Sequence, residues 1–264
     1  MHETAHHSAV SDALTSLACG PLDAGSATAV DAAKARVAAG RALGRGDGAV
    51  ATQLAALLQP QGGSASDLRV RAWTLGATLA SARIAAGAGG AESGGASAGA
   101  RTGAATPDIP VLAVAITVGD ATGASEADIA QAAAIGIEAA ARVLAAVDSS
   151  EFRARWNTAS AIGLLGATLA ASRLYGLDVT RARHALGVAA TQAAGLAHNV
   201  SLAIGALETG KAGADAIEAA LLAKHGFTSA PASIDGRRGL AALMAYRFDA
   251  RTIIEGIGSR WISV

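Results

Sequence analysis

The chain has little of several residue types that mark a particular function. It contains one cysteine, Cys19, among 264 residues, which excludes an internal disulfide and a metal site built on several cysteines. Phe, Trp and Tyr make up only 3% of the residues, so the core cannot depend on large aromatic side chains. Basic and acidic residues number 21 each, which gives a formal net charge of zero. No basic stripe with interleaved aromatic residues is present, so we expect no nucleic-acid partner.

Long apolar runs and a leader segment are also missing. The apolar run 111–118 is too short to cross a bilayer as a helix. The N-terminus MHETAHHSAV has no basic segment followed by an apolar one, so we expect no secretory signal. These observations predict no membrane association and a cytoplasmic location, where an unpaired cysteine stays reduced. Zero net charge gives little protection against self-association and favours an oligomer.

The sequence is rich in small residues with helical spacing. Just over half of the residues are hydrophobic, with alanine and glycine dominant. Apolar residues recur at steps of three and four, and sustained strand-like alternation is absent. We therefore predict an all-α fold, a multi-helix bundle. The run VLAVAITV at 111–118 fits either a buried helix or a strand, and the lack of a partner strand favours a helix.

Helix boundaries are marked clearly in the second half of the chain. Ser125 begins a capping box ahead of an apolar helix. Within 156–227 we expect three helices, the first ending at Gly176 and the second capped by Asp178 or Thr180. Gly226 follows the third, at the position of a left-handed helix cap.

The expected domain organisation is simple. We predict a disordered N-terminus at 1–10, a single helical domain at 11–264, and a flexible Gly/Ala/Ser loop at 87–106. The histidines of the first segment have no acidic or cysteine partner nearby, so we expect no metal site there. No nucleotide-binding or other cofactor motif is present, so we expect no cofactor.

Several passages resemble the helical domain of the MmgE/PrpD family, in the order and at the spacing that the family shows. They are PVLAVAITVGDATGASEADIAQAAAIGIEAAARV, HALGVAATQAAGL, GKAGADAIEAALLAKHGFTSAP, IDGRRGLAALM and IIEGIGSRW. The family includes 2-methylcitrate dehydratase, cis-aconitate decarboxylase and iminodisuccinate epimerase. The resemblance covers most of 11–264 and implies a homodimer formed by the helical domain. It also implies an active site against a second α/β domain. We expect this chain to lack that domain, and a separate chain is the candidate partner that would supply it.

The resemblance further implies that the family's catalytic residues are largely lost. The histidine of a WHPTGTAG-like motif falls at Asn157, and the lysine and histidine of a KRLHAGWAA-like motif fall at Gly205 and Glu208. A register slip would instead bring Lys211 to the lysine position. The family's Asp and His ahead of the PVLAVAI helix fall in 87–106, which has neither. Because an asparagine is no base near neutral pH and a glycine has no side chain, we predict that the family reaction is lost.

Other polar residues of the same stretch are candidates for a replacement site. The candidate catalytic residues are His198, as the natural base, Glu208 and Lys211. The candidate substrate-binding residues are Trp156, Asn157, Thr158 and Asn199. A structural interpretation is also open. His198 and Asn199 would then interact with the last carbonyls of a preceding helix, and Glu208, Lys211 and Asp215 would form a solvated helix face.

Two functions follow. The first is a non-catalytic or partner-dependent helical dimer whose active site has degenerated. The second is a repurposed cofactor-independent lyase, isomerase or cyclase that acts on a small molecule in the residual cleft. A cavity lined by Asn157, His198, Glu208 and Lys211 would favour the enzyme, whereas a flat apolar surface would favour the partner.

Overall fold

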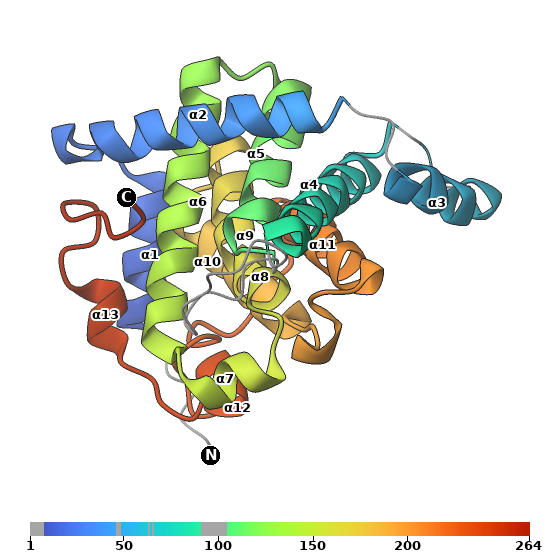
Figure 1. The fold of residues 1–264 in the computed structure, drawn as a ribbon. Helices are drawn as coiled ribbons and strands as arrows, with labels where there is room; N and C mark the ends of the chain where they lie inside the picture. Colours follow the sequence, from blue (N-terminus) through green and yellow to red (C-terminus); the bar gives the residue numbers. More distant parts are fainter. Residues whose placement is uncertain (1–7, 46–48, 63, 65, 91–104) are drawn as a thin grey trace.

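The computed structural model describes residues 8–45, 49–62, 64, 66–90 and 105–264, and every regular element in them is a helix (Figure 1). This confirms the predicted all-α class. The α-helices are α1 (Ala9–Cys19), α2 (Ala27–Leu43), α3 (Ala49–Leu58), α4 (Leu68–Gly90), α5 (Asp108–Thr122), α6 (Glu126–Val147), α7 (Ser150–Arg155), α8 (Thr158–Ala161), α9 (Gly163–Leu174), α10 (Val179–Gln192), α11 (Ala203–Lys224), α12 (Leu240–Met244) and α13 (Ala250–Ile254). Short 3-10 turns occur at η1 (Ala24–Ser26), η2 (Gln59–Gln61) and η3 (Ala197–Asn199).

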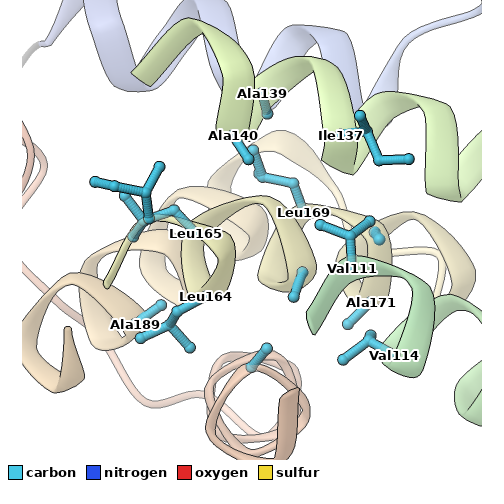
Figure 2. Packing of buried hydrophobic residues seen from close by; sticks show 14 of the residues in the cluster. Val111, Val114, Ile137, Ala139, Ala140, Leu164, Leu165, Leu169, Ala171 and Ala189 are labelled. Carbon is cyan, nitrogen blue, oxygen red and sulfur yellow. The ribbon is translucent and has the colours of Figure 1, made fainter. Parts of the chain in front are cut away.

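The core is built by close approach of helices at small residues. Leu164, Leu165 and Leu169 of α9 are buried in the core (Figure 2). On one side α9 packs against α6, and it also packs against α5, α10 and α11. At the α6–α9 crossing, a Cβ atom added to Gly166 would lie 2.2 Å from the Gly136 carbonyl oxygen. Real Cβ atoms do not approach that closely, so this crossing requires glycine.

The run at 111–118 is the central buried helix rather than a strand. It lies in α5, whose residues Ile109–Gly119 are all buried. The helix packs against α4, α6, α9 and α11, which explains why it is apolar on every side. The preference for a helix over a strand is therefore confirmed.

The predicted helix boundaries are largely confirmed. The Ser125 hydroxyl accepts from the Asp128 N–H at 3.1 Å, and Asp178 caps α10 by accepting from Arg181 N at 2.8 Å. Gly176 and Gly226 have φ values of 64° and 96°, as a left-handed cap requires. The expected single helix after Trp156 is instead α8 followed by α9.

The predicted segment boundaries need correction where they meet described residues. Ser8 is buried and its hydroxyl caps α1 by accepting from Ser11 N at 3.0 Å, so helical order begins inside the segment expected to be disordered. Likewise α4 extends to Gly90, into the predicted loop 87–106. Residues 1–7 and 91–104 lie outside the described residues.

A buried ion pair fixes the C-terminal segment to α6. Arg142 Nε donates to Glu138 Oε1 at 2.6 Å, and both side chains are 0% exposed. The Arg142 guanidinium also donates to backbone carbonyls of the C-terminal segment, those of Thr252, Ile253, Glu255, Gly256 and Arg260. The Glu138 carboxylate accepts from the N–H groups of Ile262 and Ser263. The two terminal nitrogens of Arg142 and the carboxylate of Glu138 thus hold the last residues against the bundle.

α6 is the one helix of the described residues with the length and composition of a membrane span. The most apolar 18-residue stretch of this helix is 78% buried inside the domain. That burial is typical of a core helix.

Candidate functional site

Asn157 lies at the start of α8, after the half-buried Trp156. Its side-chain oxygen accepts from the Ala159 N–H at 3.1 Å and so caps the helix. Its backbone N–H donates to the Gly195 carbonyl at 3.0 Å, next to an isolated bridge between Trp156 and Leu196. Because Asn157 is only 2% exposed, its amide nitrogen must also find a partner within the protein.

That partner is Glu208, in the first turns of α11. Asn157 Nδ2 donates to Glu208 Oε2 at 3.4 Å, and Asn199 Nδ2 donates to Glu208 Oε1 at 3.2 Å. Each carboxylate oxygen therefore accepts a hydrogen bond from a different amide. We call Asn157, Asn199 and Glu208 the amide–carboxylate group.

The backbone of η3 closes over α11 beside this group. A Cβ atom at Gly205 would lie 2.3 Å from the Asn199 carbonyl oxygen and 2.9 Å from Val200 Cα. Both of these neighbours are backbone atoms and cannot swing away. In this backbone arrangement Gly205 therefore has no room for any side chain, and a lysine is excluded.

The amide–carboxylate group has one titratable member. Amides donate and accept hydrogen bonds but take up no proton near neutral pH, so only Glu208 can act as an acid or base here. Among the described residues no lysine, arginine or histidine forms a hydrogen bond or ion pair with Glu208. Nor do three His, Cys, Asp or Glu side chains gather as metal ligands in this part of the chain.

Among the described residues, the other two candidate catalytic residues form no side-chain hydrogen bond with the group. His198 is exposed on η3, and its side chain has no hydrogen-bond partner among the described residues. It does not cap the preceding helix either, because α10 already ends at Gln192. Lys211 points along α11 to Asp215, with Nζ at 2.6 Å from Oδ1 and 2.8 Å from Oδ2. Lys211 and Asp215 thus form the expected i,i+4 pair, although the Asp215 side chain is only 19% exposed. The structural interpretation does not hold for His198 or for Glu208, which bonds to Asn157 and Asn199.

Lys211 lines a separate cavity of about 300 Å³. Arg69 in that cavity pairs with Asp67 at 2.9 Å and with Glu218 at 3.0 Å. Burial raises the pKa of Asp215, against the lowering effect of Lys211, and the charge of Glu218 adds to the rise. The hydrogen bond from Arg69 lowers the pKa of Asp67. The sequence does not predict this charge network, because Asp67 and Arg69 at the start of α4 are far from Glu218 of α11 along the chain.

Trp156 and Thr158 flank Asn157 but do not join the amide–carboxylate group. Trp156 Nε1 donates to the Met244 carbonyl at 3.2 Å, and Thr158 is the half-buried first residue of α8. Trp156 also lines a cavity of about 810 Å³ between α10 and α12. In that cavity Gln192 presents a buried Oε1 atom that has no hydrogen-bond partner among the described residues.

The MmgE/PrpD N-terminal domain model matches residues 99–252. This match spans more than half of the chain and includes α5 to α12 together with the amide–carboxylate group. The chain therefore belongs to the MmgE/PrpD family.

Among curated proteins, cis-aconitate decarboxylase of Homo sapiens is similar to this chain. The two are 33% identical over 119 residues, which is 45% of this chain and 25% of the human protein. The matched part thus spans about a quarter of that relative's length.

Proposed function

We propose that this chain is a divergent MmgE/PrpD protein in which the dehydratase or decarboxylase residues are largely lost, and that it is a non-catalytic or partner-dependent helical dimer. The observation that carries this proposal is the amide–carboxylate group. Asn157 and Glu208 stand where the family resemblance puts two histidines. Their hydrogen bond supports that register, because both residues belong to one place in the fold.

The surroundings of Gly205 support the loss of the third family residue. In this register the family lysine falls at Gly205, where the η3 backbone leaves no space for a side chain. The slipped register would use Lys211, but that ammonium group is paired with Asp215. In the part of the chain that the structure describes, no lysine, arginine or histidine then pairs with Glu208 to bind a substrate carboxylate.

Exposed apolar side chains next to the group support a partner. Leu196, Leu202 and Ile204 are 58%, 52% and 46% exposed. They lie just before and just after η3, and we call them the η3 apolar face. Exposed apolar residues of this size mark interaction surfaces when they cluster. A second copy of this chain or a separate chain would cover them in a cytoplasmic protein of this kind.

The alternative is a repurposed, cofactor-independent lyase, isomerase or cyclase. Two observations favour it: Glu208 remains half-buried and titratable, and the cavity beside Trp156 contains the unpaired Gln192 oxygen. A small molecule would then bind in that cavity or close to Glu208.

A turnover assay with cis-aconitate and 2-methylcitrate tests the proposed loss of the family reaction. We expect no turnover above background by the wild-type chain, because several members of a coupled catalytic set are missing. Turnover that the Glu208→Gln variant loses at unchanged thermal stability would show that the family reaction is retained, and would overturn the proposal. Lys211→Gln is the matched control, since it lies on the same helix in another cavity.

A further inference from the structure

A third cavity contains none of the residues of the amide–carboxylate group in its lining. It occupies about 490 Å³ among α2, α3, α4 and α5 and shares no lining residue with the sites described above except Leu58 and Val70. This volume is within the roughly 300–1,000 Å³ range that binds small molecules. Most of its lining comes from α2, α3 and α4, ahead of residues 99–252 that the family model matches, and only Ile116, Thr117 and Asp120 lie within that range.

One part of its lining is apolar. Leu58 of α3, Val70 and Leu75 of α4, and Ile116 of α5 contribute side chains from three different helices. Two small residues of α3, Ala51 and Ala55, leave the space between α3 and α4 open. An apolar body of a ligand would lose water contact on several sides here, which is favourable.

The charged part of the lining carries an excess of positive charge. Arg41 is neutralised, because it donates to both oxygens of Asp120 at 2.9 and 2.7 Å and to Glu126 at 3.1 Å. Arg45 and Arg71 line the same cavity, and their side chains form no hydrogen bond or ion pair with another described residue. The two exposed guanidinium groups are therefore free to bind an anion in bidentate fashion.

Threonine hydroxyls add polar atoms to the cavity wall. Thr74 and Thr78 donate to the carbonyls of Val70 and Thr74 at 2.9 Å each. Thr117 of α5 is only 2% exposed and lines the cavity, and its hydroxyl forms no hydrogen bond to another described residue. A hydroxyl can both donate and accept, so Thr117 can hydrogen-bond to a polar ligand atom or to water in the cavity.

We propose that this cavity binds a small organic anion with an apolar body, of the size of a medium-chain carboxylate. Arg45 and Arg71 hold the anionic head, and Thr117 hydrogen-bonds to the ligand. Leu58, Val70, Leu75 and Ile116 contact the alkyl part. The site is independent of the proposed function, since none of these residues contacts the amide–carboxylate group.

Isothermal titration calorimetry of the full chain tests the proposal. Octanoate is the probe, octyl phosphate tests the same chain with another anionic head, and octanol and acetate each lack one half of the ligand. We expect octanoate or octyl phosphate to bind, with octanol and acetate at least about tenfold weaker. No binding of either anionic probe, or equal binding of octanol, would overturn the proposal.

Variants locate the binding in this cavity. The double variant Arg45→Gln/Arg71→Gln should weaken binding by about tenfold or more, and Ala55→Leu should weaken it by filling the space. Arg237→Gln is the matched control, an exposed arginine elsewhere that should change nothing. The three variants alter exposed positions, so a thermal melt should show each of them folded. Affinity unchanged in both cavity variants would contradict the assignment.

Discussion

Two carboxylates of the Lys211 cavity show how local surroundings set the behaviour of single residues. Burial raises the pKa of Asp215, so the folded chain binds its proton more tightly than the unfolded chain does. The folded state therefore loses the stabilisation from this group as the pH rises. The loss begins at the ordinary carboxyl pKa of the unfolded chain and ends above the raised pKa of the folded chain. The hydrogen bond from Arg69 lowers the pKa of Asp67. Asp67 therefore stabilises the folded state above the ordinary carboxyl pKa, and this stabilisation is lost as the pH falls through the lowered pKa of the folded chain.

We predict opposite pH effects for the two amide variants. Relative to the wild type, Asp215→Asn should gain stability as pH rises above the ordinary carboxyl pKa of about 4. Asp67→Asn should lose relative stability as pH rises through the window just below that value. Urea unfolding across this acid range measures both differences. Variants that shift the slope in the same direction would show that the two environments are not distinct.

At the scale of helices, glycine decides how closely α4 and α11 approach. A Cβ atom at Gly210 would lie 2.3 Å from the Trp73 carbonyl oxygen and 2.5 Å from Ala77 N. Gly213, one turn later, would meet nothing closer than Val114 Cγ2 at 3.6 Å. The two glycines therefore have different roles on one helix, although the sequence around them is equally small.

We predict that Gly210→Ala destabilises the fold by about 1–3 kcal/mol, because α4 must move away. Gly213→Ala should stabilise it by about 0.5–1 kcal/mol, since alanine has the higher helix propensity and fits the available space. Chemical denaturation of both variants measures the free energy of unfolding. Equal effects would mean that the α4–α11 crossing is not set by Gly210.

At the scale of the whole molecule, the buried pair Glu138–Arg142 joins the C-terminal segment to the bundle. Removing one partner leaves a buried charge and several orphaned carbonyl groups, so Arg142→Met should cost about 3–5 kcal/mol. Arg251→Met removes an exposed pair with Asp249 and should change stability by less than about 1 kcal/mol. Thermal unfolding measures the stability loss of each variant. A loss in Arg142→Met as small as that in Arg251→Met would show that other contacts hold the C-terminal segment.

The same scale includes assembly. We predict a homodimer, because the net charge is zero and the η3 apolar face is exposed in the single chain. Light scattering in dilute solution measures the mass, and Leu202→Ser should shift it toward the monomer. Leu243→Ser is the control, since Leu243 is 76% exposed on a different helix. A wild-type monomer would remove the proposal of a dimer.

The local features of this chain were predictable from its sequence. Ser125 and Asp178 have side chains that satisfy nearby backbone N–H groups, and Gly226 tolerates a positive φ, so each acts over a few residues. The ordered motifs also indicated the family. The pair Glu138–Arg142 left a signal as well, a charged i,i+4 pair on an otherwise apolar helix, although its partners in the C-terminal segment could not be foreseen.

The tertiary structure alone decided which polar residues meet. It brought Asn157 to Glu208 across 51 positions of the chain. It paired Lys211 with Asp215 instead, although Lys211 is close to Glu208 in sequence. The physical reason is that a cap or a helical period depends on neighbouring backbone atoms. The partner of a side chain depends instead on where packing of the glycine-lined helices places distant segments.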